Sequence, residues 1–312
     1  MPRAVRYDNY GPVDVLHVVE VDMPQPQPHE VVVEVVAVGI NPGEIAVREG
    51  AVHHLWPASF PSGQGNDFAG RVTAVGSDVE GFDVGAEVIG FSDRRDSQAD
   101  YVAVPVDHLT TKPPGLSWNE AGALYGAGVT AYAAVRAVSL EPGDTVAISG
   151  AAGGVGTLAS QLARRAGARV LGIAGPANAD WLTSIGATPI AYGDGLADRL
   201  RAAAPHGIDA FIDTFGSGYV ELAIELGVDP QRIDTIIDVE AAERYGVKTD
   251  ASAEASNAPV LAELAHLVAD TELTLPIAAT YPLEQVREAY TQLGERHTHG
   301  KIVLTLRSGD TA

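Results

Sequence analysis

The amino-acid sequence predicts an α/β protein with a mostly β-structured start and a parallel sheet in its middle. Short β-branched runs, punctuated by glycine and aspartate, fill the first third of the chain. From residue 144 onward, strand-like and helix-like segments alternate, and this alternation predicts a parallel sheet with helices on both faces. The chain then closes with two helix-like segments and one apolar run, which we expect to form a final strand.

Composition limits the classes of protein to be considered. With 312 residues, of which 46% are hydrophobic, the chain can form one large or two ordinary domains. Its 20 basic and 41 acidic residues give a net charge of −21, so we expect it to repel nucleic acid backbones. Cysteine is absent, which excludes disulfides, thiol catalysis and thiolate metal ligands.

The sequence shows no signal for membrane insertion or export. An apolar run of about 18 residues, the usual minimum for a membrane-spanning helix, does not occur. The first residues, Met-Pro-Arg-Ala-Val-Arg-Tyr, lack the apolar core of a signal peptide. We therefore expect no membrane association and a cytoplasmic location.

The individual elements follow from their periodicity. In the first third we expect strands at residues 31–38, 69–76 and 86–91, in a compact and mostly antiparallel unit. Ser117 and Glu120 form a capping-box pattern, which predicts the start of an alanine-rich helix that continues to residue 139. The rest of the chain predicts strands at residues 144–149, 169–174, 187–192, 209–214 and 300–306, and helices at residues 154–166, 179–185, 260–269 and 282–293.

The strongest local signal is a glycine-rich turn between an apolar strand and an amphipathic helix, within residues 145–166. Gly153 allows a pyrophosphate to approach the backbone, and Gly156 allows the helix to pack on its strand. The first amides of a helix have no partner within it and favour an anion. We therefore predict a Rossmann dinucleotide-binding domain, although Ala151 replaces the first glycine of the usual G-x-G-x-x-G pattern; the alternative is a tight turn without a ligand. The predicted cradle residues are Ala152, Gly153, Gly154 and Val155.

The second strand of this pattern indicates which dinucleotide is bound. An NAD site usually has an acidic residue about 20 residues after the cradle, where it binds the ribose hydroxyls. Residues 169–178 contain no acidic residue, so the repulsion that would exclude a 2′-phosphate is absent. We predict NADPH as the cofactor, with Gly175, Asn178 and Tyr192 near the adenosine phosphate, although residues 170–180 contain no lysine or arginine.

Several short segments, in their order and spacing, resemble the medium-chain dehydrogenase/reductase superfamily, in its zinc-free quinone oxidoreductase branch. They are residues 38–42 (Val-Gly-Ile-Asn-Pro), 65–70 (Gly-Asn-Asp-Phe-Ala-Gly), 128–131 (Gly-Val-Thr-Ala), the cradle 151–156, 213–216 (Asp-Thr-Phe-Gly) and 300–304 (Gly-Lys-Ile-Val-Leu). The resemblance implies a GroES-like catalytic domain made from residues 1–118 and 272–312. The Rossmann domain, residues 119–271, would be inserted between them. The resemblance also implies a homodimer that pairs edge strands of the Rossmann sheet, with residues 232–237 as the candidate edge.

The resemblance also implies a metal-free reaction. Zinc alcohol dehydrogenases of this superfamily have cysteine where Asn41 stands, and His-Glu where Asn66 and Asp67 stand, so we expect no metal site. The zinc-free branch reduces carbon that conjugation has made electron-poor. The implied reaction is hydride transfer from NADPH to a quinone or an α,β-unsaturated carbonyl, which is the small-molecule partner we expect.

Position within these motifs implies roles for single residues. Asn41 resembles the residue that lines the nicotinamide and substrate cleft, and Thr130 resembles the threonine that contacts the nicotinamide. Tyr125 is a third candidate for the catalytic pocket, because its ring or hydroxyl can narrow or line it. The remaining predicted cofactor-binding residues are Thr214 and Phe215, in the Asp-Thr-Phe-Gly segment, and Lys301, in the closing motif.

Departures from the pattern keep alternative functions open. Many relatives have a tyrosine, or an Asp-Tyr or Asp-Lys pair, just after Asn-Pro, whereas residues 43–50 here read Gly-Glu-Ile-Ala-Val-Arg-Glu-Gly, so no proton donor is assigned. A lysine frequent in NADP-preferring relatives is missing near Ala179. The alternatives to a quinone or enone reductase are an enoyl reductase of secondary metabolism and an NADPH-binding structural or regulatory protein with weak catalysis.

Overall fold

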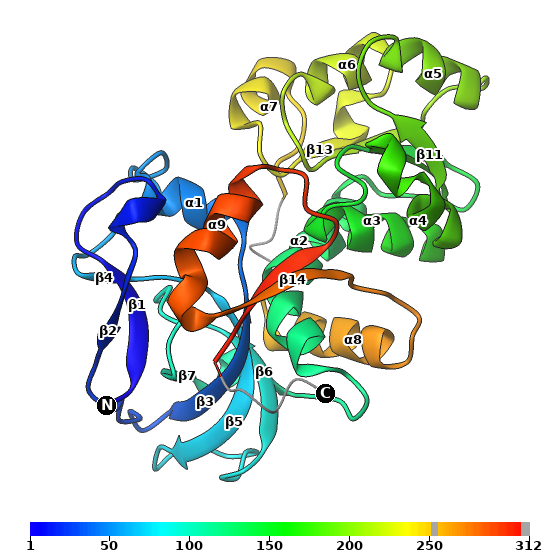
Figure 1. Ribbon diagram of the computed structural model, residues 1–312. Coiled ribbons are helices and arrows are strands. Elements are labelled where there is room, and N and C mark those ends of the chain that lie inside the picture. Colours follow the sequence, from blue (N-terminus) through cyan, green and yellow to red (C-terminus); the bar gives the residue numbers. More distant parts are fainter. Residues whose placement is uncertain (251–254, 307–312) are drawn as a thin grey trace. The chain divides into compact units, whose positions relative to one another are not determined.

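The computed structural model describes residues 1–250 and 255–306 of the chain (Figure 1). They form two compact units, one with residues 1–126 and 257–306, the other with residues 127–250 and 255–256. The first, called the flanking unit below, is built from the two parts of the chain on either side of the second, the inserted unit. The α/β fold predicted from the sequence, with a mostly β-structured part and a parallel sheet, is confirmed.

The boundaries of the units differ from the domain limits given by the sequence analysis. The first boundary falls within helix α2 (Trp118–Ala137), and the second falls just before helix α8 (Ala258–Ala269). Helix α8 belongs to the flanking unit because it packs against strand β8 (Leu109–Thr111). The division into folding domains at residues 1–118 with 272–312, and 119–271, stays a prediction.

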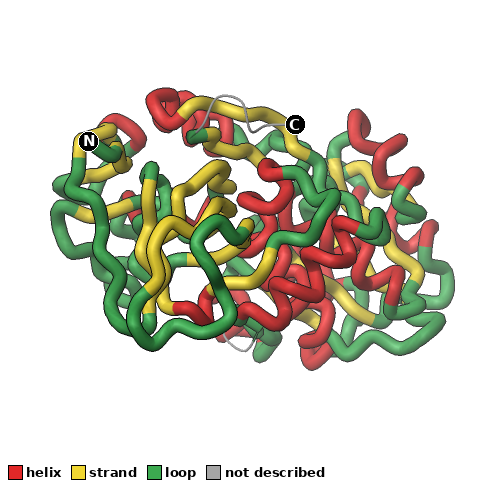
Figure 2. The backbone as a smooth tube through the Cα atoms, turned by 90° about the horizontal axis from the view of Figure 1, so that it is seen from below, coloured by secondary structure: helices red, strands yellow, loops and turns green. Residues whose placement is uncertain are grey.

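Two sheets, whose strands are yellow in Figure 2, form the framework of the flanking unit. A seven-stranded sheet has the order β14-β15-β3-β5-β6-β8, with β7 paired to β3, and a three-stranded sheet has the order β2-β1-β4. Among the described strands of this unit, every pair is antiparallel except β14 with β15, which confirms the mostly antiparallel prediction. The strands are β1 (Arg3–Tyr7), β2 (His17–Glu20), β3 (Glu30–Gly39), β4 (Ser62–Gly63), β5 (Asp67–Val75), β6 (Glu87–Phe91), β7 (Tyr101–Pro105), β8, β14 (Ile277–Pro282) and β15 (Lys301–Thr305).

Strand β3 can lie inside the large sheet because its β-branched side chains are buried on both faces. It pairs with β5, β7 and β15, and Val33, Val35 and Val38 belong to the core. Glycine brings helix α2 directly against this strand, because a Cβ on Gly39 would lie only 2.6 Å from the Cα of Ala123. The start of α2 is therefore fixed against the sheet at van der Waals distance.

The helices of the flanking unit begin at recognisable caps. Helix α2 starts at the predicted capping box, where the Ser117 hydroxyl lies 2.6 Å from the Glu120 carboxylate and the Glu120 amide donates to that hydroxyl. A second capping box, Asn41 with Glu44, starts helix α1 (Pro42–Arg48). The sequence analysis missed α1 because seven residues are too few to show helical periodicity. Helix α9 (Val286–Gly294) packs on β15.

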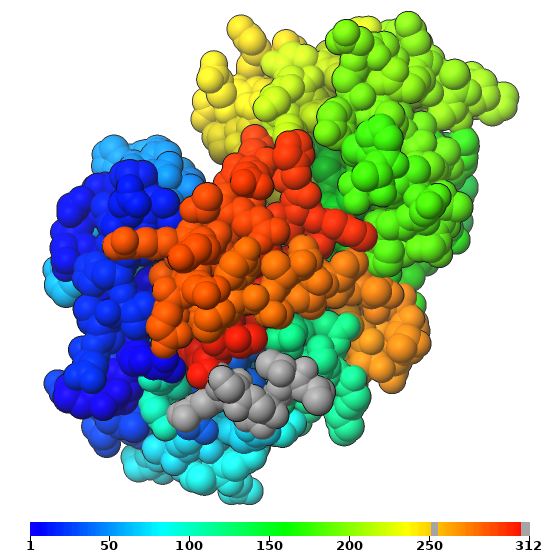
Figure 3. All heavy atoms as spheres, in the orientation of Figure 1, coloured from blue at the N-terminus to red at the C-terminus, as the bar shows by residue number. Residues whose placement is uncertain are grey.

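The first and last described segments of the chain meet within the flanking unit. Arg3 forms an ion pair with Asp100 at 2.7 Å and also contacts Glu284. Arg287 donates a hydrogen bond of 2.6 Å to the carbonyl of Leu16. Figure 3 shows the blue N-terminal segment beside the orange C-terminal one. Contacts between residues far apart in the sequence therefore hold this unit together.

Five parallel strands form the sheet of the inserted unit, in the order β11-β10-β9-β12-β13. The order reverses between β9 and β12, which is the place where doubly wound sheets bind their ligands. The predicted parallel sheet is confirmed, although the short helices α5 to α7 were missed. The elements are β9 (Thr145–Ile148), α3 (Gly154–Arg165), β10 (Arg169–Ala174), α4 (Ala179–Ser184), β11 (Thr188–Ala191), α5 (Leu196–Ala203), β12 (Ala210–Asp213), α6 (Tyr219–Glu225), β13 (Ile233–Thr235) and α7 (Val239–Tyr245).

The sheet edge predicted to pair in a homodimer is already occupied within the chain. Strand β13 ends the sheet, but the amide of Thr235 donates to the carbonyl of Lys248 and the amide of Lys248 donates to the carbonyl of Ile233, each at 3.0 Å. The Lys248 ammonium also bonds the carbonyl of Ala137 at 2.6 Å. Because these backbone groups are satisfied internally, residues 232–237 do not offer the free edge we expected. The homodimer itself stays a prediction.

Candidate functional site

The glycine-rich turn forms an anion cradle at the start of helix α3. Gly153 caps the helix with extended backbone (φ −77°, ψ 179°). Because glycine has no side chain, no cap bonds the first amides. Among the described residues, the amides of Gly154, Val155 and Gly156 have no hydrogen-bond acceptor. Free amides at the positive end of a helix dipole bind phosphate. The four predicted cradle residues, Ala152, Gly153, Gly154 and Val155, therefore lie together at a site suited to a pyrophosphate.

Glycine is required at one position of this turn for packing rather than for ligand access. A Cβ on Gly156 would lie 2.2 Å from the carbonyl oxygen of Gly150, so the helix could not approach its strand. A Cβ on Gly153 would meet the same oxygen at 3.2 Å, a much smaller conflict. Ala151 is fully buried, which explains how alanine can replace the first glycine of the pattern.

The ends of strands β9 and β12 are joined by hydrogen bonds beside the cradle. The Ser149 hydroxyl bonds the Asp213 carboxylate at 2.6 Å and accepts from the amide of Thr214 at 2.9 Å. The Thr214 hydroxyl donates to the carbonyl of Ser149 at 2.7 Å, and the Phe215 amide donates to Asp213. The predicted residues Thr214 and Phe215 thus lie where the strand order reverses. Sequence reasoning did not single out Ser149 as a site residue, although its place at a strand end was a usable signal.

The loops after β10 and β11 form a second part of the predicted cofactor site. Tyr192 lies beside Gly175, since a Cβ on that glycine would meet the tyrosine hydroxyl at 3.5 Å. Asn178 ends the short 3-10 turn that follows Gly175. Arg199 belongs to helix α5, and its guanidinium reaches back to the loop after β11, where it donates to the carbonyls of residues 191, 193 and 194. Sequence reasoning missed this arginine, because it looked for a cation only in residues 170–180.

In the flanking unit, Asn41 belongs to a buried polar cluster. The ammonium of Lys301 donates to the side-chain oxygen of Asn41 at 2.5 Å and to the carbonyl of Ile40 at 2.9 Å, and it lies 3.8 Å from Asp67 Oδ2. The amide of Gly126 in α2 donates to Asp67 Oδ1 at 3.1 Å. Because an ammonium only donates, it fixes the Asn41 side chain with its oxygen toward Lys301. Lys301 therefore lies in the flanking unit and not among the cradle residues of the inserted unit.

A second carboxylate and a tyrosine extend this cluster. Glu44 Oε2 accepts from the amide of Asn41 at 2.9 Å and from the Tyr290 hydroxyl at 2.5 Å. The same hydroxyl accepts from Gln64 at 2.9 Å and from Gln98 at 2.7 Å. Sequence reasoning missed Glu44 and Tyr290. The capping-box spacing of Glu44 after Asn41 was the signal that could have found the former, whereas nothing local marks Tyr290.

Burial governs the protonation of this cluster. It raises the pKa of Glu44, with the charge of Asp67 adding to the effect, and it raises the pKa of Asp67 against the opposing charge of Lys301. Burial also lowers the pKa of the Lys301 ammonium and raises the pKa of Tyr290 well above its usual value. Two carboxyl groups share one buried ammonium here, so charge balance favours one proton kept by the carboxyl pair.

Tyr125 and Thr130, the other predicted catalytic residues, both lie on helix α2. The Tyr125 side chain is 8% exposed, and its ring stacks on Phe91 with the centroids 4.2 Å apart. Phe91 also stacks on His108 at 4.2 Å. Thr130 is half-buried in the part of α2 that belongs to the inserted unit. The catalytic roles of both residues stay predictions.

The described residues contain neither a cluster suited to a metal ion nor a helix suited to a membrane. Within residues 1–250 and 255–306, no three histidine, aspartate or glutamate side chains gather closely enough to hold a metal ion. In the same part of the chain, no helix combines the length and the apolarity needed to cross a membrane.

The chain matches two known families of domains. Residues 27–140 match the alcohol dehydrogenase GroES-like domain, and residues 185–304 match the family described as zinc-binding dehydrogenase. Together with the fold and the cradle, these matches define the class of protein. The chain belongs to the medium-chain dehydrogenase/reductase superfamily, as the sequence motifs indicated.

Among individual proteins, the chain is similar to quinone oxidoreductases. It is 28% identical to the chloroplast envelope quinone oxidoreductase homolog of Arabidopsis thaliana, over 96% of this chain and 97% of that protein. It is 35% identical to the quinone oxidoreductase of Mus musculus over 55% of this chain, and the aligned part spans about half (52%) of the mouse protein.

Solved structures of quinone oxidoreductases have the same fold. The enzyme from Coxiella burnetii is 29% identical, with a TM-score of 0.86 and coverage of 98% of this chain and 99% of that chain. The enzyme from Escherichia coli, solved in complex with NADPH, is 25% identical, with a TM-score of 0.86 and coverage of 97% and 100%.

Proposed function

We propose that the protein is an NADPH-dependent oxidoreductase that reduces a quinone or an α,β-unsaturated carbonyl by direct hydride transfer, without zinc. The observation that carries this proposal is the anion cradle at the start of α3, in a chain that is similar to quinone oxidoreductases. The NADPH in the Escherichia coli relative supports the same cofactor here.

The residues of the inserted unit fit this cofactor. When bound, NADPH supplies a hydride from C4 of its nicotinamide. The amides of Gly154, Val155 and Gly156 are suited to its pyrophosphate, because no described group already uses them. Tyr192 and Arg199 are suited to the adenosine 2′-phosphate, because Tyr192 lies on the loop after β11 and the guanidinium of Arg199, from helix α5, bonds that same loop.

The flanking unit supplies the groups that would act on the acceptor. Reduction of a quinone to a hydroquinone takes up the hydride and one proton from solvent, and the nicotinamide leaves in its oxidised form. Lys301 holds the Asn41 side chain in one orientation, and its charge would favour negative charge that develops on an acceptor oxygen near Asn41. The Tyr290 hydroxyl donates to Glu44 in the same cluster, and burial raises the pKa of both groups.

Stopped-flow mixing tests this proposal. The NADPH-loaded protein is mixed with a panel of quinones and enals, and the absorbance of NADPH at 340 nm is followed. We expect saturable loss of absorbance with at least one acceptor, and faster loss with NADPH than with NADH. Tight binding of NADPH without loss for any acceptor would favour a weakly catalytic binding protein. The absence of NADPH binding at millimolar concentration would refute the proposal.

We further propose a homodimer in the cytoplasm. Size-exclusion chromatography with light scattering tests the dimer. A monomer at all concentrations would contradict it.

A further inference from the structure

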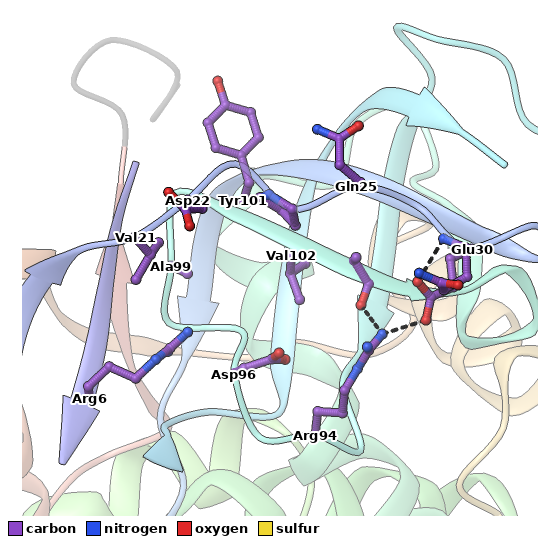
Figure 4. Close-up of a pocket in the computed structure, with 13 residues that line it drawn as sticks. Arg6, Val21, Asp22, Gln25, Glu30, Arg94, Asp96, Ala99, Tyr101 and Val102 are labelled. Carbon is purple, nitrogen blue, oxygen red and sulfur yellow. Dashed lines mark hydrogen bonds and ion pairs between the residues drawn. The ribbon is translucent and has the colours of Figure 1, made fainter. Parts of the chain in front are cut away.

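Three arginines line one pocket of the flanking unit, although acidic residues outnumber basic ones by 41 to 20 in the chain. The pocket has a volume of about 350 Å³, and its polar side chains are those of Arg6, Ser59, Ser62, Arg94, Arg95 and Asp96. A neighbouring pocket shares Arg6, Arg94 and Asp96, and Figure 4 shows Asp96 between the two arginines. Three guanidinium groups and one carboxylate therefore line the first pocket.

Two of these guanidinium groups form no direct ion pair in the described part of the chain, although the charge of Asp96 acts on Arg6. Arg94 is paired with Glu30 at 2.7 Å. Arg6 and Arg95 form no ion pair among the described residues. Arg6 donates to the carbonyl of Val5, and Arg95 donates to the carbonyls of residues 56 and 57. The Nε of Arg95 is buried without a hydrogen-bond acceptor, so this guanidinium keeps an unused donor.

The loop that carries Arg94 and Arg95, residues 92–98, is attached at both ends to the polar cluster around Asn41. At one end, Ser92 and Asn66 exchange two hydrogen bonds of 2.8 Å. At the other end, Gln98 donates to the Tyr290 hydroxyl at 2.7 Å. Because the Asn66 amide in turn donates to Glu44 at 3.2 Å, the loop that lines the pocket is connected by hydrogen bonds to the polar cluster proposed to act on the acceptor.

The backbone also holds the pocket in place. Arg95 has a φ of 57°, in the left-handed region that non-glycine residues adopt only at an energetic cost. Gly63 of β4 also lines the pocket, and the next residue, Gln64, reaches Tyr290 at 2.9 Å. A Cβ on Gly63 would lie 2.7 Å from the carbonyl oxygen of Arg95, so β4 and the loop that carries Arg95 are in close contact.

We propose that this pocket binds an anionic group, a carboxylate or phosphate, on the acceptor substrate, with Arg6 and Arg95 as the binding residues. Guanidinium groups bind such anions through paired, charge-assisted hydrogen bonds. The inference rests on the proposed reductase function and adds a substrate class to it. The acceptor carries its conjugated carbonyl system in the site around Asn41 and its anionic group in this pocket.

A matched pair of acceptors tests the proposal. The value of kcat/KM is measured for 1,4-naphthoquinone and for 1,4-naphthoquinone-2-sulfonate with the full chain and with Arg6→Gln, Arg95→Gln and the double variant. Glutamine at position 95 meets the same backbone requirement as arginine, so folding is not the variable under test. We expect the double variant to lose about tenfold or more for the sulfonate, through KM, and to keep its value for the neutral quinone.

Arg136→Gln is the control, since it removes one positive charge from α2 at a residue that does not line the pocket. We expect it to leave the ratio of the two kcat/KM values unchanged, and inorganic phosphate to compete with the sulfonate in the wild type but not in the double variant. An equal ratio in the wild type and the double variant would overturn the proposal. Phosphate binding together with a ratio of kcat/KM values that the substitutions leave unchanged would also overturn the proposal. The pocket would then hold a free anion and not the substrate.

Failure of the reductase function itself gives a different result. In that case the wild type reduces neither quinone. Calorimetric titration of the wild type and the double variant with the sulfonate then tests, in the absence of turnover, whether the pocket binds an anion. Binding to the wild type alone supports an anion site, and the absence of binding to both refutes it.

Discussion

The two units offer their ligands different kinds of polar group. The inserted unit presents backbone amides in a turn of small residues, all within one stretch around residues 149–156. The flanking unit presents buried polar and charged side chains, among which the ammonium of Lys301 contacts the amide side chain of Asn41 across 260 positions in the sequence. The first arrangement is therefore sensitive to added volume, whereas the second is sensitive to a removed charge. Each of the following substitutions tests one side of this contrast.

The largest effect is expected from Lys301→Met. It leaves Glu44 and Asp67 buried without their ammonium, and loss of one partner of a buried pair costs about 4 kcal/mol in the free energy of unfolding. The folded-state pKa values of both carboxyl groups lie above the unfolded values, so their contribution to stability is present at low pH and is lost as the pH rises through those values. Urea unfolding at several pH values should show the variant weakest at high pH.

Lys112→Met is the control for this substitution. Lys112 pairs with Glu87, a carboxylate that is 43% exposed, so its loss should cost less than about 1 kcal/mol. Equal losses in the free energy of unfolding of the two lysine variants would contradict the argument that burial makes the cluster around Lys301 sensitive to a removed charge.

The second largest effect is expected from Gly156→Ala. The added Cβ would lie 2.2 Å from the Gly150 oxygen, and relief of this overlap by a backbone shift should cost about 3 kcal/mol. Gly153→Ala is its matched partner, because its Cβ meets that oxygen at 3.2 Å. We expect it to keep stability within about 1 kcal/mol while NADPH affinity falls about tenfold. Thermal unfolding and calorimetry separate the two, and a fully stable Gly156→Ala protein would contradict the packing argument.

A pH effect of intermediate size is expected from Asp234→Asn, which removes a buried carboxyl group from the inserted unit. Burial is the main cause that raises the pKa of Asp234 to about 7, and its Oδ1 accepts from the amide of Asp250 at 2.9 Å. The contribution of a carboxyl group with a raised pKa is present below about pH 4 and is lost as the pH rises to the folded value. The wild type should therefore lose stability relative to the variant as the pH rises from about 4, and the loss should level off above the folded-state pKa of about 7.

Asparagine can accept the same hydrogen bond from residue 250, so the comparison isolates the charge. Asp229→Asn, at an exposed helix cap, is the control. Parallel pH profiles for the wild type and Asp234→Asn would show that this carboxyl group does not titrate within the folded protein.

The smallest effect is expected from Arg199→Met. Its guanidinium is half-buried on the loop beside Tyr192, and its loss should raise KM for NADPH about fivefold while KM for NADH stays constant. Arg201→Met, on the same helix but paired with Glu225, should change neither value. A parallel rise for both cofactors would indicate that Arg199 only shapes the loop.

The sequence predicted the regular parts of the fold and the cradle with good accuracy. The strand predicted at residues 31–38 is part of β3, and the Ser117–Glu120 cap and the helix after the cradle lie where expected. Each depends on neighbouring residues, whose periodicity and spacing are visible in the sequence. Short helices such as α1 were not predicted, because seven residues show no helical period. The occupied edge at β13 was not predicted either, because Lys248 pairs with that strand only after an intervening helix, α7.

By itself the sequence determined the phosphate cradle, because a turn and the helix that follows it need only residues within about four turns of one another. Tertiary structure alone decided that Lys301 would meet Asn41 and Asp67, and that Arg6 and Arg95 would line one pocket. These groups come from distant parts of the chain, and the packing of sheets and helices, not local spacing, brings them together. Whether such buried charges are balanced depends on every neighbour the fold supplies, and a linear pattern does not contain that information.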